Sequence, residues 1–106
     1  MRKSKDFIVP LSDSDFLDVK LIIEKGDITG FVLNYRIKIN HAWYQVYMVD
    51  TCHSYLHEQR FWQSPEPISL PKFDATPLKF VFEFYIEEIQ NNHEKYKKYY
   101  IDRMGI

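Results

Sequence analysis

The sequence predicts an α+β domain in which an antiparallel meander of three to four strands packs on a long C-terminal helix. Two observations predict it. Apolar and polar residues alternate over residues 18–24 and 31–39, which is the period of a half-buried strand. From Thr76 onward, apolar residues recur every three or four positions, which is the period of an amphipathic helix. We expect residues 1–106 to form a single domain, because this length suits one hydrophobic core.

The composition excludes several classes of protein. The chain has 106 residues, a formal net charge of −1, one cysteine and 45% hydrophobic residues. A single cysteine excludes a disulfide-stapled secreted domain, and the hydrophobic content excludes a disordered tail. The near-neutral charge argues against broad, non-specific nucleic-acid binding. No apolar run is long enough for a signal peptide or a spanning helix, so we expect a cytoplasmic protein without membrane contact.

Turn residues separate the predicted strands. Lys25-Gly26-Asp27 follows the strand at 18–24, and Asn40-His41 precedes a β-rich run at 43–50. A two-residue turn at Asn40-His41 would leave one face of its hairpin largely apolar. The pairs predicted on that face are Ile39 with Ala42, Ile37 with Tyr44, Tyr35 with Val46 and Leu33 with Met48. The same register places Tyr47 on the opposite, wetter face.

Three further segments complete the expected layout. Residues 51–62 could form a loop, a fourth strand or a short helix, and the prolines in residues 63–72 indicate a connector. Thr76 and Pro77 fit the N-cap and the first position of a helix that we expect to reach about Tyr100. Arg2, Lys3 and Lys5 could form an arm that binds nucleic acid, but we expect a frayed, solvated terminus.

The densest group of polar residues begins at Asp50 and includes His53, His57 and Arg60. A histidine beside a carboxylate can act as a general base, and an arginine can stabilise phosphate charge, so this set suits metal-free RNA cleavage. Asp50, His53 and His57 are also metal-ligand types, but Ser54 stands where a zinc-helix motif needs glutamate. In a third interpretation Asp50 caps the strand end and the histidines lie at the surface. We expect no metal and no cofactor, and whether the chain is an enzyme stays open.

The run from Trp43 to His53, with His57 and a long helix that ends in Lys95-Tyr96, resembles a group of small prokaryotic domains. The group comprises uncharacterised proteins and the TumE-type toxins of toxin–antitoxin pairs. The resemblance covers residues 31–100, and Asp50, His53 and His57 carry it. It implies a toxin that acts on RNA and is neutralised by an antitoxin-like protein partner with a helix-turn-helix fold.

The chain also departs from the pattern of that group. Met48 and Val49 replace an Arg-Tyr pair, Ser54 replaces a glycine, and Gln59 stands where a further histidine often occurs. The missing arginine removes one group that would bind phosphate.

Basic and aromatic residues interleave near the C-terminus. They are Lys95, Tyr96, Lys97, Lys98, Tyr99, Tyr100 and Arg103. This pattern can bind phosphates and stack on bases, although cations also suit a helix C-terminus and the tyrosines also continue the apolar stripe.

A second function class rests on the aromatic content, which is 17% of the chain. Trp43, Tyr47 and Trp62 are not needed to fill the predicted core, so they could form a surface for a partner. The alternative to the RNA-acting toxin is therefore a non-catalytic binding or homo-oligomeric assembly module. In that case we expect a homodimer through Trp43, Tyr47 and Trp62.

Overall fold

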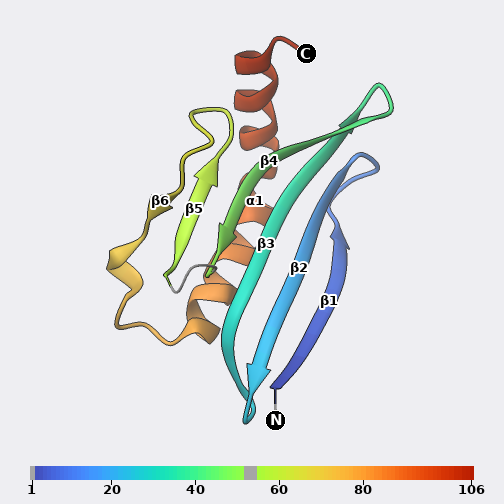
Figure 1. Ribbon diagram of the computed structural model, residues 1–106. Coiled ribbons are helices and arrows are strands. Elements are labelled where there is room, and N and C mark those ends of the chain that lie inside the picture. Colours follow the sequence, from blue (N-terminus) through green and yellow to red (C-terminus); the bar gives the residue numbers. More distant parts are fainter. Residues whose placement is uncertain (1, 52–54) are drawn as a thin grey trace.

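The computed structural model describes residues 2–51 and 55–106, and in this part of the chain six strands precede one long helix. In chain order the elements are β1 (Arg2–Pro10), β2 (Asp15–Glu24), β3 (Asp27–Ile39), β4 (Ala42–Asp50), β5 (His57–Arg60), β6 (Ile68–Ser69), the 3₁₀ turn η2 (Pro71–Phe73) and α1 (Leu78–Met104). The strands form one antiparallel sheet in the order β1-β2-β3-β4-β5-β6, as Figure 1 shows. The predicted α+β meander is confirmed, but it has more strands than the three to four expected.

The N-terminal segment is the first of the additional strands. Residues 2–10 pair with β2 from Arg2 opposite Glu24 to Pro10 opposite Phe16, so the expectation of a frayed terminus was wrong. Most of β1 is exposed, which explains why its sequence lacks the alternation of a half-buried strand. Opposite charges across the pair, such as Asp6 opposite Lys20, favour this register instead.

The β3–β4 hairpin has the predicted two-residue turn, with positive φ at Asn40 and His41. The predicted register holds from the turn to Arg36 opposite Gln45. A bulge then shifts the pairing, so that Tyr35 opposes Tyr47 instead of Val46. Val46 and Tyr47 are both buried, and the expectation that Tyr47 lies on the wetter face was wrong.

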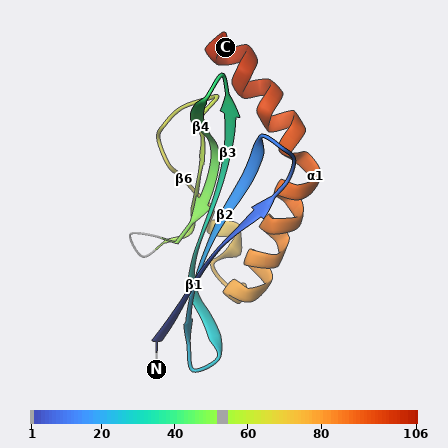
Figure 2. The same cartoon turned by 90° about the vertical axis from the view of Figure 1, so that its right-hand side faces the viewer.

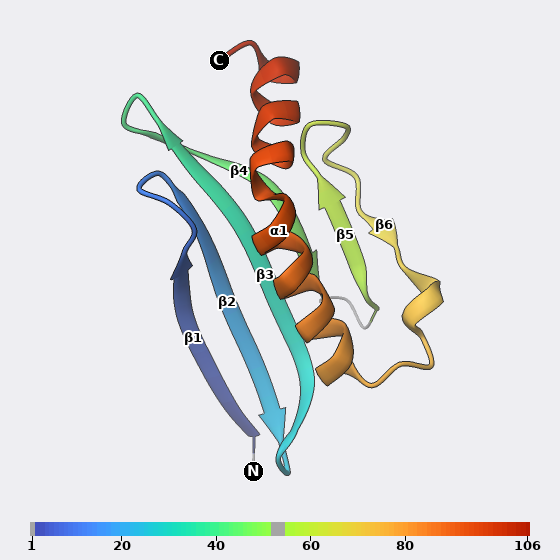
Figure 3. The same cartoon turned by 180° about the vertical axis from the view of Figure 1, so that it is seen from behind.

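Helix α1 covers one face of the sheet and runs diagonally along β3 and β4 (Figures 2 and 3). The core lies between them. Its buried residues are Leu17, Val19, Phe31, Leu33, Tyr35, Ile37, Val46, Tyr47, Val49, Trp62, Leu70, Val81, Tyr85, Ile89 and Tyr100. Pro77 occupies the N-cap position instead of the first helical position, and the helix extends past Tyr100 to a left-handed C-cap at Gly105.

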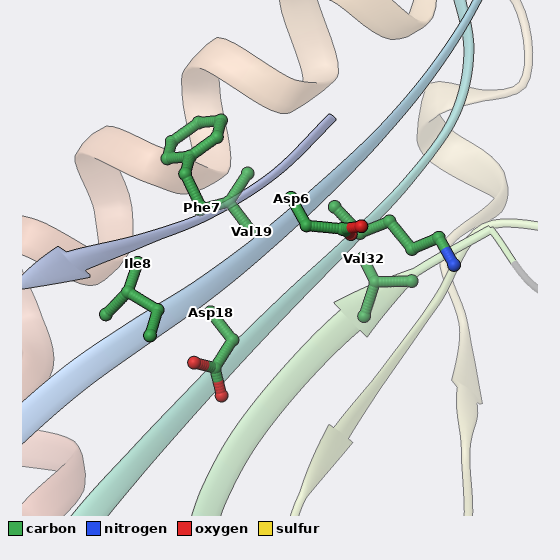
Figure 4. Close-up of a pocket in the computed structure, with 7 residues that line it drawn as sticks. Asp6, Phe7, Ile8, Asp18, Val19 and Val32 are labelled. Atoms are coloured by element: carbon green, nitrogen blue, oxygen red, sulfur yellow. The ribbon is translucent and has the colours of Figure 1, made fainter. Parts of the chain in front are cut away.

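The opposite face of the sheet, which we call the open face, is not covered by the helix. Arg36 pairs with Asp18 there at 2.7 Å, and its guanidinium lies 4.1 Å from the centre of the Trp43 ring. A hollow of about 470 Å³ lies over β1, β2 and β3. Figure 4 shows Ile8 and Asp18 pointing to one side of the sheet and Phe7 and Val19 to the other.

The three aromatic residues expected to share a surface do not share one. Trp43 is on the open face with 47% of its surface exposed, whereas Tyr47 and Trp62 retain only 2% and 9%. Tyr47 and Trp62 both pack against the ring of Tyr96 in α1. The bulge in β4 turns Tyr47 toward the helix, so only Trp43 of the three is largely exposed.

Candidate functional site

The end of β4 and the start of β5 place Asp50 opposite His57. The Nε2 atom of His57 lies 2.8 Å from Oδ1 of Asp50, and Nδ1 lies 3.2 Å from the carbonyl oxygen of Tyr55. Both side chains are buried. The pair joins two neighbouring strands at their ends.

The four predicted site residues are therefore only partly brought together. Asp50 and His57 meet, but His53 lies outside the described residues. Arg60 is three positions after His57 in the same strand, so alternation directs it to the other face of the sheet. There its Nε donates to Oε1 of Glu58 at 3.1 Å. The structure therefore does not place Arg60 beside the Asp50–His57 pair.

Arg60 instead lines a small polar cavity between the sheet and the helix, which we call the β5–α1 cleft. Its volume is about 130 Å³. The lining residues are Tyr47, Glu58, Arg60, Leu70, Lys72, Phe84, Tyr85, Glu88 and Tyr96. They come from β4, β5, the connector after β6 and one side of α1, so only the folded chain assembles the cleft.

Glu58 is the buried carboxylate of the cleft. It lies between His57 and Gln59 in β5 and faces the helix, because neighbouring residues of a strand point to opposite faces. The Tyr47 hydroxyl donates to its Oε2 atom, and Arg60 donates to Oε1. A carboxylate has about four acceptor positions, so these two bonds leave Glu58 able to accept a further hydrogen bond.

The tyrosines of the cleft are held in their protonated form. Burial, and then the charge of Glu58, raise the pKa of Tyr85 to about 12. Burial and the nearby Glu88 likewise raise the pKa of Tyr96, whose hydroxyl donates to Oε1 of Glu88 at 3.2 Å. At neutral pH the cleft therefore offers hydroxyl donors, beside the carboxyl groups of Glu58 and Glu88 and the basic side chains of Arg60 and Lys72.

Within residues 2–51 and 55–106, no three His, Cys, Asp or Glu side chains are grouped closely enough to hold a metal ion. The donor set of the cleft instead resembles that of acid–base chemistry, with carboxylates, cations and neutral hydroxyls in one place.

Sequence reasoning selected Arg60 for chemistry and named Tyr47 and Tyr96 in other roles, but it did not select Glu58, Tyr85 or Glu88. A signal was present, because Glu58 and Arg60 are two positions apart and must share a face if residues 57–60 form a strand. This signal could not be used, because the sequence did not show whether residues 51–62 form a loop, a strand or a helix. The cleft residues of α1 could not be predicted, because no local sequence pattern indicates which strands the helix packs against.

Comparison with known protein families identifies one family to which the chain is similar. A family model for a domain of unknown function (DUF7718) matches residues 1–106. The chain belongs to this family. No curated protein and no solved structure matches it. In the described part of the chain, no helix is both long and apolar enough to cross a membrane.

Proposed function

We propose that the protein acts on RNA, as a cytoplasmic toxin-like component, and that the β5–α1 cleft carries the chemistry. The observation that supports this proposal is the meeting of Glu58, Arg60, Lys72 and Tyr85 around one small cavity. A carboxylate, a cation and a neutral hydroxyl can supply the base, the charge stabilisation and the acid for cleaving a phosphodiester without a metal.

The proposed reaction is an internal transesterification of the RNA backbone. Glu58 accepts the proton of a ribose 2′-hydroxyl, whose oxygen attacks the adjacent phosphorus. The bond from phosphorus to the 5′-oxygen breaks, and Tyr85 donates its proton to that oxygen. Arg60 and Lys72 stabilise the negative charge that builds on the phosphoryl oxygens. The products are a 2′,3′-cyclic phosphate and a 5′-hydroxyl end, and proton transfer through water returns Glu58 and Tyr85 to their starting forms.

Incubation of the purified chain with single-stranded RNA in EDTA tests this reaction. We expect cleavage to 2′,3′-cyclic phosphate ends, and loss of that cleavage in Glu58→Gln and Arg60→Ala. His57→Asn serves as the control, since His57 lies on the other face of the sheet. Intact RNA, or cleavage that survives both cleft substitutions, would rule out the proposal.

The toxin role adds an antitoxin-like protein partner. Expression of the chain alone should slow growth, and co-expression with the product of a neighbouring gene should restore it. Unchanged growth, together with no binding of RNA or of the neighbour's product, would remove the toxin role.

The open face of the sheet favours a second candidate, a homodimeric assembly module. The protein exposes 6791 Å², whereas a compact monomer of 12.9 kDa exposes about 6,300 Å². Acidic and basic side chains alternate across the open face, as in Asp6 opposite Lys20 and Asp18 with Arg36, so two copies could match charges. Sedimentation should then give a dimer that Trp43→Ala converts to monomer. A monomeric wild-type chain would exclude this candidate.

A further inference from the structure

A second and larger hollow lies beside the β5–α1 cleft, and the proposed reaction leaves it unused. Its volume is about 620 Å³, and Trp62, Gln63, Tyr99, Asp102 and Arg103 line it. Tyr99 exposes 46% of its surface, whereas Trp62 is nearly buried. The hollow therefore combines an accessible aromatic ring with an amide, a carboxylate and a guanidinium.

Aromatic contacts connect the hollow to the cleft. The Trp62 ring stacks on Tyr96 with centroids 5.2 Å apart and planes at 20°, and the centroid of the Tyr99 ring lies 5.8 Å from that of Trp62. Tyr96 lines the cleft and Trp62 lines the hollow. The stacked Trp62–Tyr96 pair thus joins the lining of the hollow to the lining of the cleft.

The two cavities differ in the size of group they can hold. About 130 Å³ corresponds to roughly four water-sized groups at about 30 Å³ each, which suits a phosphate and not a base. The hollow is larger, at about 620 Å³, and open to solvent, so it has room for a base.

We propose that this hollow binds the base of the ribonucleotide whose phosphate occupies the cleft, and that it prefers guanine. The inference rests on the proposed function and names its substrate as single-stranded RNA with an unstacked guanine. Tyr99 stacks on the base, as aromatic side chains do with bases splayed out of single strands. Asp102 accepts from the N–H groups of the guanine edge, and Arg103 donates to its acceptor atoms. Gln63 can do either.

The chain contains two tryptophans, so Trp43→Phe leaves Trp62 as the only indole fluorophore. In this background we expect GMP to quench Trp62 emission at lower concentration than AMP, CMP or UMP. Tyr99→Ala should weaken GMP binding about 5- to 150-fold, which is the range for loss of one base–aromatic stack. Asp102→Asn should reduce the preference for GMP over AMP.

Phe80→Ala is the matched control, because Phe80 is also an exposed aromatic residue of α1 but lies near the other end of the helix. It should leave GMP binding unchanged. Equal quenching by all four nucleotides would overturn the guanine preference. No quenching, or unchanged GMP binding in Tyr99→Ala, would overturn the site.

The same variants separate this inference from the proposed function. RNA cleavage that is unaffected by Tyr99→Ala, in a chain that binds no nucleotide, refutes the base site and leaves the cleft chemistry standing. GMP binding that Tyr99→Ala removes, in a chain that cleaves no RNA, supports the base site and refutes the cleavage.

Discussion

Two buried carboxylates lie between the sheet and α1, and each accepts hydrogen bonds from side chains of the same kinds. Asp15 accepts from the Tyr35 hydroxyl at 2.7 Å, from Ser12 and from Lys97 at 3.3 Å. Glu58 accepts from the Tyr47 hydroxyl and from Arg60. Each centre therefore pairs a carboxylate with a buried tyrosine and a basic side chain.

The two centres differ in what lies beside them. At Asp15 the partners come from β3, α1 and the turn before β2, so the bonds fasten the helix across the sheet. At Glu58 both partners come from the sheet, while α1 contributes the far wall of a cavity. The cation is also more open at Glu58, since the Arg60 side chain is 42% exposed and that of Lys97 is 28% exposed. Hydrogen bonds of the same kind thus hold the helix on the sheet at Asp15 and position side chains in a cleft at Glu58.

Exchanging each carboxylate for its amide tests this difference most strongly. Asp15→Asn and Glu58→Gln should each cost about 1–3 kcal/mol of unfolding free energy in urea, because each weakens a buried hydrogen-bond network. Only Glu58→Gln should also slow RNA cleavage, by about 10²–10⁴-fold, since it removes the proton acceptor. Equal cleavage by the two folded variants would contradict the distinction.

Removing the two cations gives the next largest effect. Arg60→Ala should slow cleavage about 10²–10³-fold at saturating RNA, because it removes a charge that stabilises the phosphoryl oxygens. Lys97→Ala should leave the rate nearly unchanged and lower the urea midpoint. A slower reaction in Lys97→Ala at full folding would mean that the Asp15 centre also takes part in catalysis.

Removing the two tyrosine hydroxyls should have similar effects in both centres. Tyr35→Phe and Tyr47→Phe each delete a hydroxyl that donates to a buried carboxylate, at about 1 kcal/mol per bond. Tyr35→Phe should be the more costly, since its hydroxyl also lies 3.2 Å from the carbonyl oxygen of His93. Urea denaturation measures both, and a larger loss in Tyr47→Phe would reverse this order.

The smallest effects concern pH, and they have opposite signs. Burial alone would raise the pKa of Asp15, but hydrogen bonds from Ser12 and Tyr35 and the charge of Lys97 hold it below its usual value. The stability it contributes is complete above pH 3.8 and is lost as the pH falls further, so Asp15→Asn should flatten the acid limb.

Tyr85, beside Glu58, has a raised pKa of about 12. The stability that Tyr85 contributes is complete below about pH 10 and is lost between about pH 10 and 12. Tyr85→Phe should remove this loss of stability at alkaline pH. Denaturation curves at acid and alkaline pH measure both limbs. An unchanged limb in either variant would assign that pH dependence to other groups.

Local sequence accounts for much of the sheet. The alternation in residues 31–39 and the Asn40-His41 turn predicted the β3–β4 hairpin, because side-chain period and turn geometry are local properties. The bulge that buries Val46 and Tyr47 together was not predictable in this way, since it depends on the fit of Tyr47 against Tyr96 of a distant helix. Strand β1 was missed for a related reason, as an exposed edge needs no apolar pattern.

The sequence by itself determined the α+β class, the two-residue turn and the apolar stripe of α1, all of which follow from short-range periodicity and backbone preference. It also marked Asp50, His57 and Arg60 as polar residues of interest. Only the tertiary structure decided that Asp50 and His57 form a buried pair while Arg60 joins Glu58 in a different cavity. The physical reason is that successive residues of β5 point to opposite faces, and only the packing of α1 determines which face becomes a cleft.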